Sequence, residues 1–279
     1  MKDKRKITIS KIVTPLLQYS NAPTKGQSLH ILQRFNLSLW LSLFCLILIG
    51  CQTASSDAER KYPVELTWQR FSVEYQALCL QTYHLAWEAV KSRTASMDKD
   101  WAVVLDVDET VLDNSRYQEI LHEKNEKFNY YWDGWVKEEN CPPVPGAKAF
   151  IDSVRSLGKF AHVVYITNRN QNLEEATRNN LKKVGLWKDG DVLMCQKDRS
   201  DTKELRRNEV VNGTNRCEGL GQRIIVARIG DQLADMEAYP ENVSPDDYRK
   251  HYDKIDQWGT AYFMLPNPMY GYWERGYNR

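Results

Sequence analysis

Short apolar runs recur along the chain after residue 100, and helix-like segments separate them. The runs are Trp101–Leu105, His162–Ile166, Val192–Cys195, Ile224–Ile229 and Ala261–Leu265. Strands joined by helical segments of this length need right-handed crossover connections, which produce a parallel sheet with helices on both faces. The pattern therefore predicts an α/β fold with a doubly wound, mainly parallel sheet. Ligands of such sheets bind beyond the carboxyl ends of the strands, so we expect the chemistry in the residues that follow each run.

Apolar residues also recur at helical spacing before the first run, over residues 65–92. The stripe consists of Trp68, Phe71, Tyr75, Leu78, Leu85 and Ala89. It predicts one amphipathic helix that packs its aromatic side chains into the core and covers the sheet. Between the first and second runs, residues 114–145 are rich in charged and aromatic residues and end in prolines. We interpret this segment as a small helical cap over the site.

The first predicted strand leads directly into two carboxylates, Asp106 and Asp108. Carboxylates at this spacing after a strand can converge on one point and provide both a nucleophile and metal ligands. Crowding ionised carboxylates is costly, so a divalent cation is the natural compensation at neutral pH. The Asp-x-Asp pattern is weak support by itself, because acidic pairs are common in turns.

Polar residues follow two further strands or lie on a nearby helix. Thr167 and Asn168 follow the second strand and could donate hydrogen bonds to phosphate oxygens, although the same pair is equally expected as a helix cap. Asp231 follows the fourth strand, and Asp235 comes about one helical turn later. Lys203 lies on a helix predicted to begin near residue 201. There its ammonium group could neutralise the aspartates and a transferred phosphoryl group, or simply face solvent.

The ordered set of these motifs resembles the haloacid dehalogenase (HAD) superfamily, over about residues 65–279. Within it, the chain is most similar to the class C acid phosphatases, a group of lipoprotein acid phosphatases and 5′-nucleotidases with four motif aspartates. The similarity rests on the segments DVDETVLDNSRY, WDGW, VPGA, ITNR, GDQLAD and LPNPMYGYWE. Two features depart from the family pattern: Gln232, where Asn often follows the Gly-Asp pair, and a longer stretch between Arg169 and Asp231. Both concern the surroundings of the metal more than the reaction.

The resemblance implies a catalytic role for several motif residues. Asp106 is expected to attack phosphorus and form an aspartyl-phosphate. Asp108 is expected to protonate the leaving alkoxide and then to activate water. Thr167 and Asn168 are expected to bind phosphate oxygens, and Lys203 to offset their negative charge.

The resemblance also implies a magnesium site. The Asp106 carboxylate, the backbone carbonyl of Asp108 and Asp231 are expected to hold Mg²⁺, with Asp235 as a further ligand or as a neighbour that orients the ligands. The expected enzyme is therefore a magnesium-dependent phosphomonoesterase.

Two aromatic residues indicate the substrate class. In the class C family, aromatic side chains from the segments of Trp132 and Tyr270 sandwich the base of a nucleoside monophosphate. Such stacking contributes roughly 1–3 kcal/mol per base and tolerates different bases, since every base presents a flat face. The resemblance thus predicts a nucleoside 5′-monophosphate as the substrate, with simple packing of a lid as the alternative role of either aromatic.

The first 50 residues have the pattern of an export signal. They carry seven Lys or Arg and one Asp, and their apolar stretch, Leu37–Gly50, is short for a bilayer span and typical of a signal peptide. The stretch runs into Cys51 as LIGC, which is typical of a bacterial lipobox and predicts a lipidated Cys51. An ordinary signal peptide or membrane anchor with a chance cysteine is the alternative.

The rest of the chain divides into two parts. We expect residues 51–63 to be a tether and residues 64–279 to be the phosphatase domain. We expect the protein to be lipid-anchored in a bacterial cell envelope, at the outer membrane if the source is Gram-negative.

The distribution of charge along the chain limits the kinds of binding partner. The net charge of +1 combines +6 in residues 1–50 with −5 in residues 51–279, so the mature part gives no sign of binding a nucleic-acid polymer.

Four cysteines of the mature part could form disulfides in three pairings or remain buried thiols, and the sequence favours neither. They are Cys79, Cys141, Cys195 and Cys217. The oligomeric state is not indicated.

Two other functions fit parts of the pattern. A general phosphomonoesterase or a phosphotransferase without nucleotide preference would use the same site. A non-catalytic surface lipoprotein that binds a ligand on a degenerate scaffold is the other, and the presence of both Asp106 and Asp108 argues against it.

Overall fold

A parallel sheet forms the centre of the computed structural model, which describes residues 61–238, 245–271, 273 and 274. Its strands lie in the order β3-β2-β1-β4-β5, and every pair of neighbours is parallel. The strands are β1 (Trp101–Leu105), β2 (Ala161–Asn170), β3 (Val192–Gln196), β4 (Ile224–Gly230) and β5 (Tyr262–Met264). All of the apolar runs therefore form strands, as the pattern predicts. The order places β1 at the centre, where both faces of the strand are buried.

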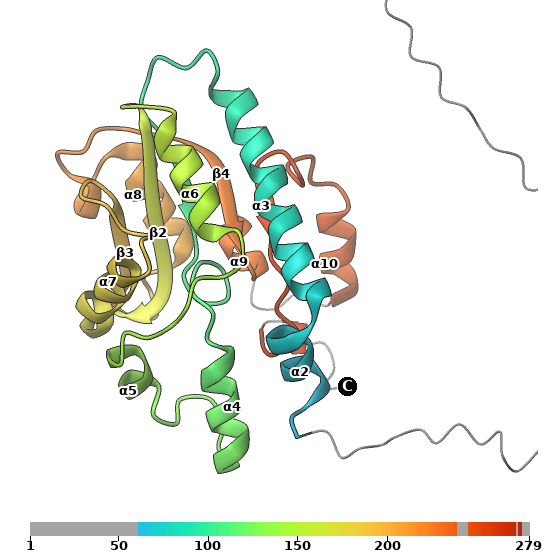
Figure 1. The fold of residues 1–279 in the computed structure, drawn as a ribbon. Helices are drawn as coiled ribbons and strands as arrows, with labels where there is room; N and C mark the ends of the chain where they lie inside the picture. The colour runs from blue at the N-terminus through green and yellow to red at the C-terminus, as the bar shows by residue number, and fades with distance from the viewer. Residues whose placement is uncertain (1–60, 239–244, 272, 275–279) are drawn as a thin grey trace, which may run out of the picture. The chain divides into compact units, whose positions relative to one another are not determined.

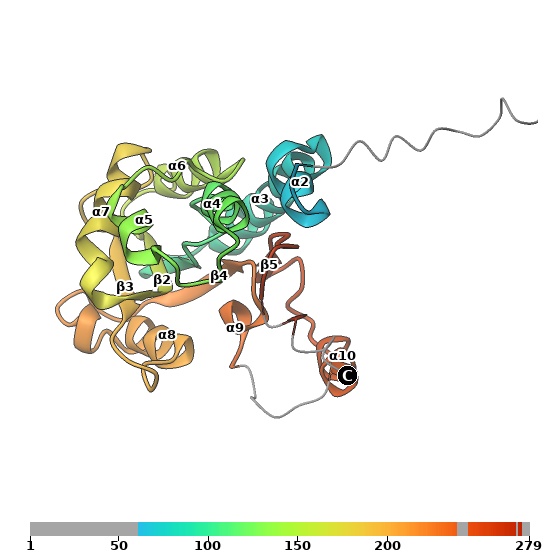
Figure 2. The same cartoon turned by 90° about the horizontal axis from the view of Figure 1, so that it is seen from below.

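Helices cover both faces of this sheet (Figures 1 and 2). Alternate residues of β1 face opposite sides: Val103 belongs to a large apolar cluster and Val104 to a smaller one. The large cluster includes side chains of α3 (Val73–Thr94), α6 (Ala147–Ser156) and α7 (Glu174–Lys183). The smaller cluster includes side chains of α8 (Lys203–Asn212) and η2 (Asn215–Cys217). The doubly wound α/β architecture is thus confirmed.

The N-terminal helical region differs from the prediction in continuity. It consists of α2 (Val64–Phe71) and α3, separated at Ser72, rather than one helix over residues 65–92. Ser72 has extended backbone angles, and its side chain accepts a hydrogen bond from the Tyr75 backbone N–H at 3.0 Å. A serine in this position satisfies one of the unpaired amides at the start of a helix, so it begins a new helix and interrupts the old one. The prediction of a single helix was wrong at this residue.

The predicted apolar stripe was wrong in part as well. Phe71, Leu78 and Leu85 are exposed, although Tyr75 is buried and Trp68 and Ala89 pack partly buried against the core. The buried residues of α3 are Tyr75, Cys79, Tyr83, Ala86, Val90 and Thr94. The helix covers the sheet as expected, but with a face that includes small residues and tyrosines. Apolar residues occur on more than one face of α3, so spacing alone did not decide which face is buried.

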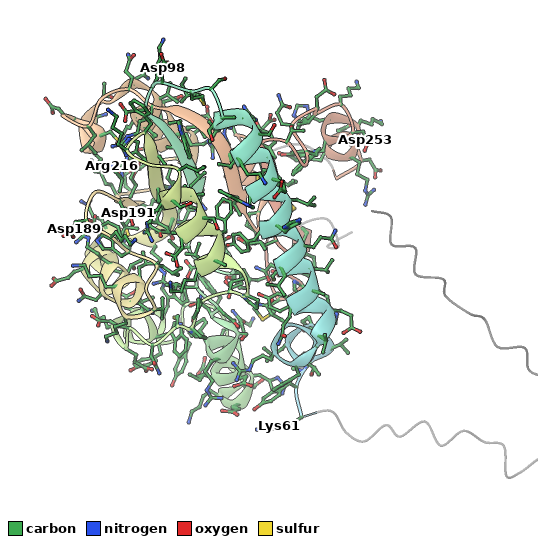
Figure 3. The ribbon with its side chains drawn as sticks, turned by 45° about the horizontal axis from the view of Figure 1, so that its top comes forward. Lys61, Asp98, Asp189, Asp191, Arg216 and Asp253 are labelled. Carbon is green, nitrogen blue, oxygen red and sulfur yellow. The ribbon has the colours of Figure 1, made fainter. Side chains whose placement is uncertain are left out.

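The cap segment contains α4 (Ser115–Lys124) and α5 (Trp132–Lys137), which lie beyond the carboxyl ends of the strands (Figure 1). Leu112 and Pro143 form an antiparallel bridge where this segment leaves and rejoins the sheet domain. Asp98, in the loop before β1, lies at the end of α3 that is away from the cap, whereas Lys61 lies near the start of α2 (Figure 3). The remaining elements are η1 (Gln171–Leu173), α9 (Leu233–Met236) and α10 (Pro245–Tyr252).

Cys79, Cys141, Cys195 and Cys217 are free and buried in the structure. Burial raises the pKa of the Cys79, Cys141 and Cys195 thiols to about 12, so these groups are protonated at neutral pH. Within the described part of the chain, no helix is long and apolar enough to cross a membrane. The predicted signal peptide, lipidated Cys51 and most of the tether lie outside the described residues.

Candidate active site

The carboxyl ends of neighbouring strands meet at one pocket. Leu105 near the end of β1 pairs with Tyr165 of β2 on one side and with Ile229 of β4 on the other, so the residues that follow lie close together. The pocket has a volume of about 170 Å³. It is lined by Asp106, Asp108, Phe128, Trp132, Asn168, Arg169, Lys203, Asp231, Gln232 and Tyr270. Residues from separate strands, a helix, the cap and the C-terminal segment therefore share one cavity.

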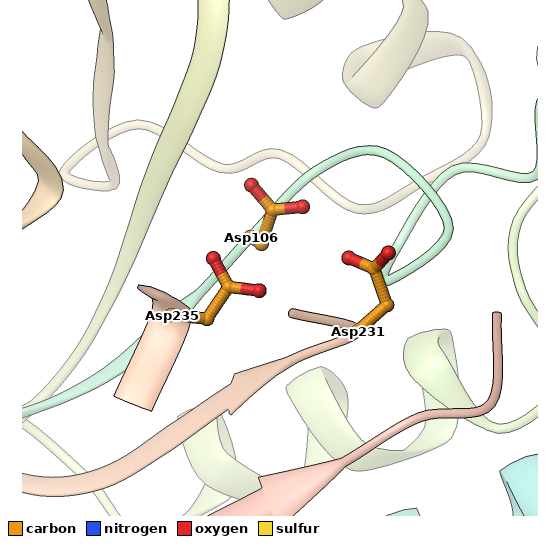
Figure 4. A group of neighbouring side chains, drawn as sticks. All are labelled: Asp106, Asp231 and Asp235. Atoms are coloured by element: carbon orange, nitrogen blue, oxygen red, sulfur yellow. The ribbon is translucent and has the colours of Figure 1, made fainter. Parts of the chain in front are cut away.

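Three carboxylates, here called the acid cluster, lie together at the carboxyl ends of the strands. Asp106 follows β1, Asp231 follows β4 and Asp235 lies on α9 (Figure 4). One oxygen from each lies within 4.8 Å of one from each of the others, and all three residues are buried. The Lys203 ammonium group donates to Asp106 Oδ1 at 2.5 Å and also to Asp235 Oδ1. Two of the three acids thus accept from the same ammonium group of α8.

The electrostatics of the acid cluster leave negative charge uncompensated. Burial raises the pKa of Asp106 well above its usual range, Lys203 opposes this shift, and the neighbouring aspartates add to it. Burial, followed by the charge of Asp235, raises the pKa of Asp231 to about 7. If all three acids are ionised, Lys203 balances only one of the three charges. A hard divalent cation would supply the rest, and buried carboxylate oxygens are the ligands that Mg²⁺ prefers.

Two amides orient Asp231 within the acid cluster. The side-chain nitrogens of Gln232 and Asn267 donate to Asp231 Oδ2 at 2.7 and 2.8 Å. The hydroxyl of Thr110 is the donor to the other oxygen, at 3.5 Å. Gln232 also forms a capping box with Asp235, because its backbone N–H donates to Asp235 Oδ2 at 2.8 Å. The family departure at Gln232 therefore still provides an amide beside Asp231.

Asp108 has different surroundings from Asp106, although only one residue separates them. Arg169 donates to Asp108 Oδ1 through Nη2 at 2.7 Å and to Asp108 Oδ2 through Nε at 3.2 Å. Asn114 Nδ2 donates to Asp108 Oδ1 at 2.8 Å. This forked contact is the strong form of a carboxylate–guanidinium pair. Asp108 thus has donors of its own and is not one of the three carboxylates of the acid cluster. A contribution of its backbone carbonyl to a metal site stays a prediction.

Asn114 connects Asp108 to the cap. Its side-chain oxygen accepts from Trp135 Nε1 at 2.9 Å and from the Cys141 thiol at 3.2 Å. Arg169, in turn, lies 5.6 Å from the centre of the Trp132 ring, within the range of a cation–π contact. Both residues that hold Asp108 are thus held by tryptophans of α5.

Comparison with known proteins identifies the family of this site. Residues 48–273 match the family described as HAD superfamily, subfamily IIIB (Acid phosphatase). The chain belongs to this acid phosphatase family. It is similar to the crystal structure of the class C acid phosphatase from Bacillus anthracis with tungstate bound, at 31% identity and a TM-score of 0.67. A second structure of the class C acid phosphatase from that organism matches at 31% identity and a TM-score of 0.65. Each match covers 76% of this chain and 86% of the other.

The family membership confirms the fold and the general activity inferred from the motifs. The parallel sheet and the helices on both faces are those of a HAD-like class C acid phosphatase. Acid phosphatases hydrolyse phosphate monoesters, so a small phosphorylated substrate follows from the family. In this acid phosphatase, the pocket combines the buried acid cluster with a separate aspartate, Asp108, to which Arg169 donates.

The two residues predicted to bind phosphate are placed differently in this acid phosphatase. Asn168 is exposed and lines the pocket. Thr167 is fully buried, and its hydroxyl accepts from the Arg169 backbone N–H at 3.1 Å and donates to Asp108 Oδ2 at 3.4 Å. The structure therefore brings the Asn168 amide to the pocket, whereas the Thr167 hydroxyl belongs to the group that holds Asp108.

The predicted aromatic pair lines the same pocket, with a third ring between its members. Trp132 comes from α5, Tyr270 from the C-terminal segment, and Phe128 from the loop before α5. The Phe128 ring centre lies 5.6 Å from that of Trp132 and 6.2 Å from that of Tyr270. Tyr117 contacts Trp132 edge to face at 5.0 Å. The aromatic row Trp132–Phe128–Tyr270 is thus one wall of the pocket.

Sequence reasoning missed several residues that contact the site. Arg169 and Asn114 lie in the motif segments ITNR and DVDETVLDN, but no role followed from their spacing. Phe128 had no motif signal, and Arg206 was expected on the helix of Lys203 but without a role. Only the folded chain brings Phe128 to the pocket wall and Arg206 to Asn168. One signal was available: a partly buried Asp108 needs a cation or several donors, so an arginine at a neighbouring strand end was a reasonable candidate.

Proposed function

We propose that this acid phosphatase is a magnesium-dependent hydrolase of nucleoside 5′-monophosphates that acts through an aspartyl-phosphate on Asp106. The observation that supports this most directly is the contrast between two aspartates in one pocket. Asp106 lies beside Lys203 in the acid cluster, whereas Asp108 is held outside it by Arg169 and Asn114. Two carboxylates with different partners can serve as nucleophile and as proton carrier in one reaction.

In the first step an oxygen of Asp106 attacks phosphorus, and the bond from phosphorus to the leaving oxygen breaks. Protonated Asp108 gives its proton to that oxygen, so that the nucleoside leaves as an alcohol. Lys203 lies within hydrogen-bond reach of Asp106 and can offset charge on the phosphoryl oxygens. The Asn168 side chain lines the pocket and can donate to the same oxygens.

In the second step Asp108 takes a proton from water, and the water oxygen attacks the phosphorus of the aspartyl-phosphate. The bond between phosphorus and Asp106 breaks, which releases inorganic phosphate and regenerates the Asp106 carboxylate and protonated Asp108. Thr167 and Arg169 hold Asp108 in place through its two carboxylate oxygens. Proton transfer by a positioned carboxylate of this kind typically contributes about 10²- to 10⁴-fold in rate.

The acid cluster fits a magnesium ion. Asp106 and Asp231 would hold it, Asp235 would ligate it or orient the other two, and the Asp108 backbone carbonyl is a further candidate ligand. Bound Mg²⁺ would neutralise the carboxylates and the incoming phosphate, and this lets two anions approach each other. The amides of Gln232 and Asn267 fix Asp231 for such a role.

The aromatic row supports a substrate with a flat base. Trp132, Phe128 and Tyr270 form one wall of the pocket that Asp106 and Asp108 also line. A base stacked on this wall would keep its 5′-phosphate within the same small cavity. A general phosphomonoesterase would have little use for such a wall, but lid packing remains the competing role of these rings.

We also propose that the enzyme is exported and anchored in the bacterial envelope by a lipid on Cys51, at the outer membrane if the source is Gram-negative. This proposal rests on the basic leader, the apolar stretch and the sequence LIGC. Globomycin treatment, or Cys51→Ala in the full-length chain, should cause the precursor to accumulate in a bacterial host. Unchanged processing in both cases would refute lipidation.

A substrate panel tests the activity. The purified mature domain should release phosphate from adenosine 5′-monophosphate and nicotinamide mononucleotide faster than from a small ring-free phosphate, and only with Mg²⁺. Equal rates on all substrates would leave a general phosphatase. Phosphate transfer to an added alcohol in place of release would indicate a phosphotransferase, and no turnover of any substrate would favour the non-catalytic alternative.

A further inference from the structure

The helix that carries Lys203 also carries a buried arginine that contacts the phosphate-binding segment. Arg206 lies one turn after Lys203 on α8 and is fully buried. Its guanidinium Nη2 donates to the side-chain oxygen of Asn168 at 2.7 Å. Its Nη1 donates to the backbone carbonyls of Thr167 and Met194 at 2.5 and 3.1 Å. One side chain therefore joins α8 to the ends of β2 and β3.

The contact with Arg206 decides which way the Asn168 amide faces. A guanidinium group has only donors, so the Asn168 atom that it contacts must be the oxygen. The amide nitrogen, with two N–H donors, is then on the opposite branch of the side chain, and Asn168 itself is exposed at the pocket. Phosphate oxygens are acceptors, so this is the orientation that can bind them. With the opposite orientation, the amide oxygen would face the phosphate and repel it.

The position of Arg206 is itself fixed. Its Nε donates to the Thr202 carbonyl at 3.3 Å and lies 3.7 Å from Asp201 Oδ1. Asp201 is paired in turn with Arg216, at 2.9 Å. The planar fork of a guanidinium can make all of these contacts at once, whereas a lysine in its place could not. The residue is thus rigid enough to set the orientation of an exposed neighbour.

We propose that Arg206 is a positioning residue for phosphate binding, which acts by holding the Asn168 side-chain oxygen so that the amide N–H groups face the pocket. The proposal rests on the proposed role of Asn168 in binding phosphate. Arg206 itself lies behind Asn168 and reaches the substrate only through it. Because Arg206 lies on α8, it also fixes the position of the Asn168 amide relative to Lys203, which the same helix places beside Asp106.

Calorimetric titration of the purified, magnesium-loaded domain with inorganic phosphate tests this role. Asn168→Ala should weaken phosphate binding by about ten- to a hundredfold, the range expected for a lost hydrogen bond to a charged group. Arg206→Lys keeps the positive charge but loses the fork, and it should weaken binding by roughly three- to tenfold. In the Asn168→Ala background, Arg206→Lys should have no further effect, because no amide is left to orient.

The matched control is Arg155→Lys on α6. Arg155 is also largely buried, donates to the Leu186 carbonyl at 2.7 Å and pairs with Asp191. Asp191 comes just before β3, at the amino end of that strand, whereas the pocket lies at the carboxyl ends. This variant should lose stability without a change in phosphate affinity. An equal loss of affinity in both lysine variants would overturn the proposal, since it would show a general effect of removing a buried guanidinium.

The double variant separates the remaining outcomes. If Arg206→Lys weakens binding equally with and without Asn168, its charge acts on phosphate directly and the positioning role is wrong. If Asn168→Ala leaves phosphate affinity unchanged, the proposed phosphate-binding role of Asn168 is wrong, and the positioning role of Arg206, which rests on it, is wrong as well. If Asn168→Ala weakens binding but Arg206→Lys does not, only the present inference fails.

A second substitution covers the case in which Arg206→Lys does not fold. Asn168→Asp keeps an acceptor for Arg206 but removes the donors. It should be at least as thermally stable as Asn168→Ala and should bind phosphate more weakly than that variant. A lower stability than Asn168→Ala would contradict the contact between Arg206 and the Asn168 side-chain oxygen.

Discussion

Asp106 and Asp108 are one residue apart in sequence, but they belong to two different electrostatic regions. The acid cluster holds three buried carboxylates around the single ammonium group of Lys203. The other region holds one carboxylate, Asp108, with a guanidinium fork, an amide and a hydroxyl around it. The first region lacks positive charge, and the second is balanced by its own side chains.

This contrast predicts that a cation from solution stabilises the first region, whereas protein contacts are sufficient for the second. Carboxylates that outnumber their cations in a buried site are costly, and a bound divalent ion relieves that cost. Asp108 needs no such ion, because Arg169 and Asn114 satisfy it. The second region also contacts the cap, through Trp132 beside Arg169 and Trp135 beside Asn114.

The largest effect is expected from Asp106→Asn in the acid cluster. It should lower kcat by at least about a hundredfold, because the proposed nucleophile is lost, while few packed atoms change. Phosphate release from adenosine 5′-monophosphate would measure it, with thermal unfolding as the control for folding. A residual rate above a tenth of the wild-type rate would show that Asp106 is not the nucleophile.

Trp132→Ala tests the cap side of the second region. It should lower kcat/KM for adenosine 5′-monophosphate by roughly ten- to a hundredfold, at about 1.4 kcal/mol per decade, and leave a small ring-free phosphate almost unchanged. Trp187→Ala is a matched control, because Trp187 stacks on Tyr165 and does not line the pocket. Equal losses on both substrates would mean that Trp132 only supports the cap, and the enzyme would then be a general phosphatase.

Arg169→Lys tests whether the fork on Asp108 matters for proton transfer. The variant keeps the charge but loses the two-point contact, so we expect a fall in kcat of about tenfold on alkyl phosphates. An aryl phosphate with a good leaving group needs less help from an acid and should be affected less. The ratio of the two rates measures the effect. An unchanged ratio would limit Arg169 to a structural role.

The smallest effect concerns the pH dependence of stability in the acid cluster. The pKa of Asp231 is raised to about 7 in the metal-free fold, above the ordinary value of about 3.9 for an aspartate. The folded state therefore binds more protons than the unfolded state between these values, and this group makes the metal-free protein less stable as pH rises from about 4 to about 7. Asp231→Asn should reduce that loss.

Mg²⁺ should act in the opposite direction in the same pH range. Its binding competes with protons, so the rise in Tm that it causes should be larger at pH 7.5 than at pH 5, by a few degrees at roughly 2–4 °C per kcal/mol. Thermal unfolding with EDTA and with Mg²⁺ at both pH values measures this. A rise in Tm that is independent of pH would place the ion away from these carboxylates.

The sequence by itself determined the strands and the chemistry at their ends. Each strand is a short apolar run, and a strand buried on both faces needs such a run whatever its neighbours are. Because parallel strands end at one edge, Asp106, Asp108, Asn168 and Asp231 could be assigned to a common site before the fold was known. Family resemblance added the roles of these residues, since local spacing alone does not separate a nucleophile from a turn.

Only the tertiary structure decided which residues hold those groups. Arg169 is 61 positions from Asp108, and Arg206 is 38 positions from Asn168, so no local pattern connects either pair. A long, charged side chain can reach several neighbours, and the one it contacts depends on which strand ends and helices the fold brings together. The same reason applies to α3, where several faces carry apolar residues and packing against the sheet selected one of them. Local sequence thus fixed the reactive groups, while long-range packing fixed their charge balance and orientation.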